Sequence, residues 1–195
     1  MSQTDVNLQD KIKKDLKKNL DPKRYEHTMG VAYTAASLAM CHDKDAESAY
    51  IAGLLHDCAK YMSNDEKLKY CTKNMLYISD TESQNPSLLH GKVGSDISQK
   101  KYKIKDEDIL NAITFHTTGR PEMSDLEKII FIADYIEPHR THDPDLKQIR
   151  HVAFQNLDKA LELILINTLS HLDTMDRAID PMTEKTYMYY TKKRR

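Results

Sequence analysis

Hydrophobic residues recur at helical spacing through most of the chain. Leu8, Ile12, Leu16 and Leu20 lie four residues apart among lysines and aspartates, which is typical of an amphipathic helix. No stretch shows a convincing alternation with the period of two that a half-buried strand requires. We therefore expect an all-α fold, with helices at residues 8–20, 22–40, 45–57, 63–75, 88–100, 106–115 and 124–136, and further helices capped by Asp143 and by Asn156 or Asp158.

Residues with known preferences for helix ends support these boundaries. Asp21 and Pro22 are suited to the N-cap and the first helical position of the second helix. Ser63 and Ser124, each followed three residues later by a glutamate, form capping boxes. The polar, proline-containing stretch at residues 77–87 is instead typical of a loop.

The buried face of the helix at residues 22–40 is harder to assign because this segment is rich in alanine. We assign its core face to Met29, Ala32, Ala36 and Met40. A neighbouring stripe runs beside that face through His27, Val31, Thr34 and Leu38. The small side chains should allow neighbouring helices to approach closely.

The composition indicates a soluble chain that folds as one domain. Apolar residues make up 39% of the 195 residues and charged residues 30%, with only 5 Gly and 6 Pro. We expect a single domain over residues 1–195 with its core at about 20–177, and we interpret residues 191–195 as a basic, solvated tail. The 29 Lys and Arg nearly balance the 30 Asp and Glu, which argues against a nucleic-acid partner.

The cysteines and the apolar runs bear on the cellular compartment. Three cysteines form an odd number without a Cys-x-x-Cys pair, which argues against a disulfide framework or a thiolate zinc site. The N-terminus lacks the apolar segment of a signal peptide, and the longest apolar runs are too short to cross a bilayer. We therefore expect a cytoplasmic protein without a membrane partner.

The stretch IAGLLHDCAK at residues 51–60 carries the most informative polar pair. A His-Asp dipeptide is a weak signal by itself, and this chain contains three. Those at residues 42–43 and 142–143 fall at polar helix junctions, where the aspartate is more simply an N-cap. Only His56-Asp57 follows an apolar helix and precedes a nearby lysine, Lys60. Buried together, an imidazole and a carboxylate need a hydrogen bond, an ion pair or a metal.

Four more polar residues occur in apolar surroundings: His27, His90, His116 and Asp134. Taken singly, each histidine could instead be a core residue that is hydrogen-bonded to a backbone carbonyl. Asp134 could instead form an ion pair with an arginine. Together with the His56-Asp57 pair, they lie at the ends or on the inner faces of different predicted helices. One shared polar centre would satisfy all of them.

Imidazole nitrogens and carboxylate oxygens, without a thiolate, suit iron, manganese, zinc or cobalt. Six such groups are too many for one tetrahedral zinc but suit two metals that share a carboxylate. Two metals roughly 3.5–4 Å apart are a known arrangement for hydrolysing phosphate esters and anhydrides. The residues thus predict a dinuclear hydrolase.

Four motifs carry a resemblance to a known family: RYEHTMGV, AGLLHDCAK, LLHGKVG and FHTTGRPEMSDLEKIIFIADYIEPHR. Over about residues 20–177 the chain resembles the HD-domain metal-dependent phosphohydrolases, which have a helical-bundle fold. More narrowly, it is similar to the bacterial YqeK-type proteins, which are symmetrical diadenosine tetraphosphate hydrolases. The resemblance implies hydrolysis of a dinucleoside polyphosphate into two ADP.

The resemblance also implies roles for individual residues. One metal would be held by His27, His56, Asp57 and Asp134. A second would be held by Asp57, His90 and His116, with Asp57 bridging. The metals would be divalent or mixed-valent, with iron favoured and manganese, cobalt or zinc as alternatives.

Asp57 and Lys60 are then the expected catalytic residues, acting with a metal-bound hydroxide. The expected substrate contacts are Arg24, His27, Lys60, His90 and Arg140. For Arg24, Lys60 and Arg140 a surface salt bridge is the alternative to a phosphate contact.

Several functions remain open at this point. The chain could be a different HD-domain nucleotide phosphohydrolase or phosphodiesterase, a dinuclear-iron oxygenase, or a non-catalytic nucleotide sensor. Metal identity, preference for adenine or guanine, and oligomeric state are also open, with a homodimer as one alternative.

Overall fold

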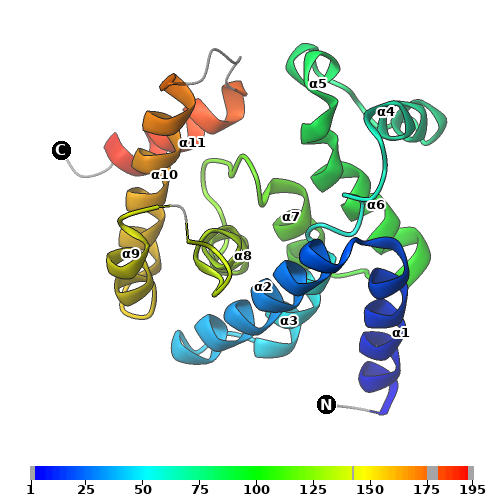
Figure 1. The fold of residues 1–195 in the computed structure, drawn as a ribbon, viewed down its shortest axis with the longest axis horizontal. Coiled ribbons are helices and arrows are strands. Elements are labelled where there is room, and N and C mark those ends of the chain that lie inside the picture. The colour runs from blue at the N-terminus through cyan, green and yellow to red at the C-terminus, as the bar shows by residue number, and fades with distance from the viewer. Residues whose placement is uncertain (1–2, 142, 175–179, 193–195) are drawn as a thin grey trace.

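Helices and their connections make up the whole of residues 3–141, 143–174 and 180–192, which the computed structural model describes, and no strand occurs among them. The predicted all-α fold is therefore confirmed. The elements are α1 (Gln3–Asn19), α2 (Pro22–Cys41), α3 (Ala46–Leu55), α4 (Asn64–Lys73), α5 (Asp80–Gln84), the short 3₁₀ helix η1 (Pro86–Leu88), α6 (Leu89–Tyr102), α7 (Glu107–Phe115), α8 (Asp125–Ile136), α9 (Leu146–Ala153), α10 (Leu157–Thr174) and α11 (Pro181–Lys192) (Figure 1).

The predicted helix starts are largely confirmed by their hydrogen bonds. The Asp21 carboxylate accepts the backbone N–H of Arg24 at 3.0 Å, with proline at the start of α2. Both predicted capping boxes are formed, at Ser63 for α4 and at Ser124 for α8. Asn156 accepts the backbone N–H of Lys159 at the start of α10.

The prediction of a loop at residues 77–87 is wrong, since this segment contains α5 and η1. A third capping box, formed by Ser79 and Glu82, starts α5. Lys92 of α6 then fixes the turn by an ion pair with Glu82 at 2.7 Å. The capping signal was present in the sequence and is the physical reason for the helix.

Two aspartates assigned as N-caps do not have that role. Asp45, rather than Asp43, caps α3, and Asp43 has a positive φ of 54°. Asp145 occupies the N-cap position of α9, and Asp143 accepts the backbone N–H of Asp145 at 2.7 Å. The helix predicted to reach residue 57 ends at Leu55, which leaves the polar pair in the turn that follows.

The C-terminal part of the chain differs from the prediction. Residues 191 and 192, assigned to a solvated tail, are the last residues of α11, whereas residues 193–195 lie outside the described residues. His142 and residues 175–177 of the expected core also lie outside them. Thr186 of α11 is fully buried and lies over Gly119, which has a φ of 62°. A Cβ at Gly119 would approach the Thr186 methyl group to 2.7 Å, so α11 packs on a turn that requires glycine.

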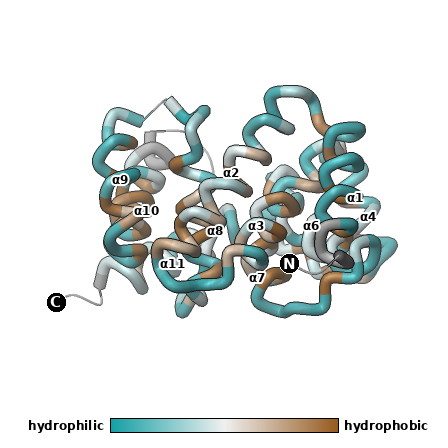
Figure 2. The backbone as a smooth tube through the Cα atoms, turned by 90° about the horizontal axis from the view of Figure 1, so that it is seen from below, coloured by the Kyte–Doolittle hydropathy of each residue, from teal (hydrophilic) through white to brown (hydrophobic). Residues whose placement is uncertain are grey.

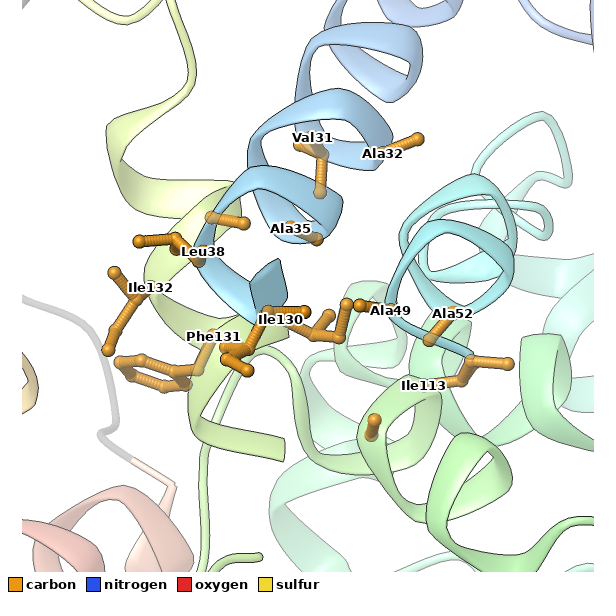
Figure 3. Packing of buried hydrophobic residues seen from close by; sticks show 14 of the residues in the cluster. Val31, Ala32, Ala35, Leu38, Ala49, Ala52, Ile113, Ile130, Phe131 and Ile132 are labelled. Atoms are coloured by element: carbon orange, nitrogen blue, oxygen red, sulfur yellow. The ribbon is translucent and has the colours of Figure 1, made fainter. Parts of the chain in front are cut away.

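The closest helix packing is between α2 and α3. Ala32 and Ala35 of α2 and Ala49 and Ala52 of α3 are all buried in the core (Figure 3). A Cβ at Gly53 would lie 2.7 Å from the Ala32 Cα, so the two backbones are in near contact. The small side chains thus bring the end of α3 alongside α2.

The face of α2 predicted to be buried is only partly correct. Ala32 is buried, but Met29 and Ala36 are half-buried and Met40 is 63% exposed. The stripe assigned beside it is the more buried one, with His27, Val31 and Leu38 in the interior. Alanine on both faces left no hydrophobic contrast from which to choose between them.

Hydrophobic stretches run along α8 and α10, whereas α1 is mostly hydrophilic (Figure 2). The described helices are all too short or too polar to cross a membrane. The main core is built by α1–α3 and α6–α10, and a smaller cluster of Ala59, Cys71, Leu89 and Val93 lies between α4 and α6.

Candidate metal centre

Five helices bring the six sequence-predicted ligands together. His27 lies on α2, His56 and Asp57 directly follow α3, His90 is near the start of α6, His116 follows α7, and Asp134 lies on α8. The four histidines and Asp57 are buried, and Asp134 is half-buried. The structure therefore places all six predicted side chains at one site.

Asp57 lies at the middle of this site, and its two carboxylate oxygens face opposite ways. Its Oδ2 is 3.5 Å from His56 Nε2 and 3.9 Å from His27 Nε2. Its Oδ1 is 3.4 Å from His90 Nε2 and 3.6 Å from His116 Nε2. This arrangement suits a carboxylate shared between two metal ions.

We describe the site as two halves. The Asp134 half contains His27 and Asp134, with His27 Nε2 3.0 Å from Asp134 Oδ1. The His116 half contains His90 and His116, with their Nε2 atoms 3.0 Å apart. His56 lies between them, because it can join a metal-binding group with His27 and Asp134 or with Asp57 and His116.

The histidine rings are oriented through their Nδ1 atoms. His56, His90 and His116 each donate Nδ1–H to the carbonyl oxygen of the residue three positions earlier, at 2.6–2.7 Å. His27 donates its Nδ1–H to the Glu137 carboxylate at 3.1 Å. In the neutral rings the Nε2 lone pairs therefore point into the centre, as metal ligands require.

The donor atoms match a metal centre better than a network of internal hydrogen bonds. His27 Nε2, His56 Nε2 and Asp57 Oδ1 are buried without a hydrogen-bond partner, and the 3.0 Å approach of His27 to Asp134 lacks hydrogen-bond geometry. The facing Nε2 atoms of His90 and His116 present two lone pairs to each other. Buried polar atoms left in this way are costly, and bound cations would satisfy them.

Electrostatics keeps most of these groups in the form that binds metal. Burial lowers the pKa of His56 to about 4 and that of His90 well below its usual range, so both are neutral near pH 7. Burial opposes ionisation of Asp57, but His56 and the other nearby groups hold its pKa well below its usual value. Burial opposes protonation of His27, but the neighbouring carboxylates of Asp134 and Glu137 outweigh it and raise the pKa of this histidine.

Glu137 is a functional residue that the sequence reasoning missed. Its carboxylate is 1% exposed and orients His27, while its second oxygen accepts two hydrogen bonds from His139 at 2.8 and 3.0 Å. A Cβ at Gly30 would lie 2.6 Å from Glu137 Oε2, so glycine leaves the space for this carboxylate. The sequence signal was the position of Glu137, three residues after Asp134 and therefore near it on the helix surface. The His139 side chain itself is exposed.

Three cations lie at the edge of the centre. Arg24 Nη1 is 2.8 Å from Asp57 Oδ2, and Arg140 Nη2 is 2.8 Å from Asp134 Oδ1. Lys60 Nζ is 3.9 Å from Asp57 Oδ1. Their side chains are 36%, 38% and 32% exposed respectively, so each can contact both a ligand carboxylate and solvent.

Two pockets adjoin the centre. The Asp134 pocket, of about 250 Å³, contains the ligands His116 and Asp134 together with Arg140. The Lys92 pocket, of about 410 Å³, is formed by the α5 region, the end of α7 and the start of α11. Thr117 lines both pockets, and its hydroxyl lies 3.2 and 3.1 Å from the Nε2 atoms of His90 and His116.

A larger hollow of about 620 Å³ lies elsewhere, between α2, the end of α8 and α9. Its walls are mostly apolar and include Tyr33 and Phe154, but none of the six ligands lines it. We therefore assign the chemistry to the Asp134 pocket, which two of the ligands line, together with the Lys92 pocket, which shares Thr117 with it, since size alone does not place reactive groups.

Comparison with known proteins identifies the family of this chain. The model of the HD domain family matches residues 24–139. A symmetrical bis(5'-nucleosyl)-tetraphosphatase of Halalkalibacterium halodurans is 40% identical over 172 residues, which cover 88% of this chain and 91% of that protein. The protein of the same name from Bacillus subtilis is 38% identical over 174 residues, with the same coverage.

A solved structure agrees with the fold at high similarity. The crystal structure of a predicted HD superfamily hydrolase involved in NAD metabolism, from Clostridium acetobutylicum, superposes with a TM-score of 0.91. It is 42% identical in sequence, and the match covers 95% of this chain and 97% of that one. The chain thus belongs to the HD-domain family, and within it to the group of the symmetrical bis(5'-nucleosyl)-tetraphosphatases.

Proposed function

We propose that this chain hydrolyses diadenosine tetraphosphate symmetrically into two ADP. The observation that carries the proposal is that four histidine Nε2 atoms converge with the carboxylates of Asp57 and Asp134 at one site. The two carboxylate oxygens of Asp57 face different histidines there. Relatives of about 40% identity that bear the name of this activity support the choice of substrate.

The six side chains would hold two metal ions, and we propose iron, with manganese, cobalt or zinc as alternatives, because nitrogen and oxygen donors suit these metals. Metal ions held there would supply hydroxide at neutral pH by lowering the pKa of water toward neutrality. Asp57 positions both halves of the site through its two oxygens. Glu137 holds the His27 ring in the orientation that presents Nε2.

The three cations at the edge would stabilise negative charge on the polyphosphate. Phosphoryl transfer depends mainly on positioning and electrostatic stabilisation, so guanidinium and ammonium groups near the reacting phosphorus are effective. Arg24, Lys60 and Arg140 already contact the ligand carboxylates and can reach solvent. We propose that they contact the non-bridging oxygens and the leaving phosphate.

The test is an assay of purified protein with diadenosine tetraphosphate and added iron or manganese under anaerobic conditions. ADP as the sole product is expected, because water attacks near the middle of the phosphate chain. Equal amounts of AMP and ATP would contradict symmetrical cleavage. A requirement for oxygen would indicate an oxygenase, and metal and nucleotide binding without turnover would indicate a sensor.

Lys60→Ala tests whether this lysine contacts phosphate rather than supporting the metals. We expect two bound metals and a kcat/KM lowered by about 10–100-fold, the range of one to two charge-assisted contacts. Lys69→Ala is the matched control, because Lys69 is exposed on the nearby α4. An unchanged kcat/KM for Lys60→Ala would remove this residue from the site.

A further inference from the structure

The Asp134 pocket has the features of a nucleoside site. It lies between α8, the start of α9 and α10, and contains the aromatic residues Phe131 and Tyr135. Asp143 also lines it and accepts hydrogen bonds from the Tyr135 hydroxyl and from Asn167 Nδ2. An aromatic ring can stack on a base, and a carboxylate can accept a ribose hydroxyl.

The Lys92 pocket repeats this combination with different residues. It contains Tyr77 and Phe115 as aromatic rings and Glu82 and Asp180 as carboxylates. Lys92, paired with Glu82 at 2.7 Å, supplies a cation in the same wall. The α5 region and the start of α11 stand on either side of the connection between α7 and α8 (Figure 1).

The two pockets meet at the metal centre. Thr117 lines both, and its hydroxyl contacts His90 and His116 in the His116 half. A chain of phosphates that joins one pocket to the other would pass Thr117 beside these ligands. Sites that enclose a drug-sized ligand have about 300–1,000 Å³. The Asp134 pocket, of about 250 Å³, is below this range and the Lys92 pocket, of about 410 Å³, is in its lower part, so a dinucleotide needs more than one pocket.

We infer that the two nucleosides of a dinucleoside polyphosphate occupy the Asp134 pocket and the Lys92 pocket, with the middle of the phosphate chain at the metal centre between them. This inference rests on the proposed function and deepens it. It explains symmetrical cleavage by geometry, since the reacting groups lie between two sites of similar chemistry. The larger hollow beside Tyr33 and Phe154 holds neither nucleoside.

The test measures how many ADP molecules the metal-loaded enzyme binds per chain, by calorimetric titration. We expect two for the wild type and one for each variant in which tryptophan fills a pocket, Thr168→Trp for the Asp134 pocket and Met182→Trp for the Lys92 pocket. The KM for diadenosine tetraphosphate should rise about 5–150-fold in both, as expected for loss of a stacked base.

Ser37→Trp is the matched control, because it places the same side chain in the larger hollow. It should bind two ADP with an unchanged KM. Loss of ADP by this control, binding of only one ADP by the wild type, or an unchanged KM in Met182→Trp would overturn the inference. Because ADP binding is measured without turnover, a failure of the proposed function would appear separately, as no ADP formed from diadenosine tetraphosphate.

Tyr77→Ala and Asp143→Asn test the same two pockets without a bulky side chain, in case the tryptophan variants misfold. Tyr77 is 79% exposed, so its removal from the Lys92 pocket should leave the melting temperature unchanged. Asp143→Asn keeps the shape of the Asp134 pocket and weakens one acceptor. Both should raise KM more than they lower kcat, whereas unchanged KM values in both would also contradict the inference.

Discussion

The two halves of the metal centre hold their histidines in different ways. In the His116 half, both rings are oriented by backbone carbonyl oxygens of their own helical turns. In the Asp134 half, His27 depends on the side chain of Glu137, which comes from another helix. The backbone carbonyls cannot be removed by substitution, but Glu137 can. The Asp134 half is therefore the half whose metal affinity can be tuned.

The two halves also differ in charge. Burial lowers the pKa of His90, while the carboxylates beside His27 raise its pKa. Arg24 and Arg140 bind the carboxylates of Asp57 and Asp134, and Lys60 approaches the other oxygen of Asp57. The polyphosphate is thus expected to meet cations on both sides of Asp57.

Asp57→Ala should have the largest effect, because it removes the one group common to both halves. We expect loss of both metals and a fall in activity of at least about a thousandfold, because the pKa of the attacking water would no longer be lowered. Elemental analysis and turnover of the purified variant measure this. Retention of two metals would show that Asp57 does not bridge them.

Single-ligand variants should separate the halves. His116→Ala should lose one metal and keep the other, and His27→Ala should do the same for the opposite half. In each variant, the metal affinity of the half that lost its ligand should fall by more than the roughly 10–100-fold that removal of an orienting partner costs. Metal titration monitored by calorimetry distinguishes one weakened site from two, and equal weakening of both sites would mean that the halves are not independent.

Glu137→Gln should weaken only the Asp134 half, by about 10–100-fold in metal affinity, because the carboxylate that orients His27 is lost. Gly30→Ala should also weaken metal binding in the Asp134 half, because the new Cβ would lie 2.6 Å from Glu137 Oε2 and displace this oxygen. Glu26→Gln, on the exposed surface of α2, is the control. If the two variants bind metal as tightly as the control does, Glu137 has no orienting role.

The smallest effect concerns acid stability of the metal-free protein. The folded-state pKa of His56 is about 4, below the ordinary value of 6.5, so its contribution to stability is present above pH 6.5 and lost as the pH falls toward 4. The full loss from His56 is about 3 kcal/mol. Urea denaturation in the presence of a chelator between pH 7.5 and 4.5 measures it.

The effect of His27 on the acid stability of the metal-free protein should be opposite to that of His56. Its pKa is raised, so its stabilising contribution is present below pH 6.5 and declines as the pH rises through its folded-state value. His90→Gln should therefore make the metal-free protein less sensitive to acid, and His27→Gln more sensitive. The same pH dependence in both variants would contradict the electrostatic difference between the halves.

Most of the ligand set was predictable because each residue interrupts an apolar helix or follows one. His56 and Asp57 stand out after IAGLL, and Asp134 stands out within IIFIADYI. The expected helix boundaries around them were close to those observed, since capping residues act locally. Gly91 is unfavourable within a helix by propensity, but a Cβ there would lie 2.6 Å from the Thr114 carbonyl oxygen, so the tight packing of α6 on α7 explains the glycine.

The features that were missed depend on contacts between distant segments. Glu137 before a proline has the sequence appearance of a surface residue, and only folding brings it to His27, 110 residues earlier. The role of Thr117 requires His90 and His116 to be adjacent in space. The core face of α2 was predicted only partly correctly, because alanines on several sides give a weak periodic signal.

The direction of each Nδ1–H bond has a consequence for how the protein acquires its metals. Neutral imidazoles whose Nε2 atoms are already bare release no proton when an ion binds, which describes His56 and His90 near pH 7. His27 has a raised pKa, so it stays protonated to a higher pH than a free imidazole and, where protonated, must lose a proton before it binds a metal. Metal binding by the two halves should therefore differ in its dependence on pH. Under mildly acidic conditions the His116 half would bind its metal before the Asp134 half.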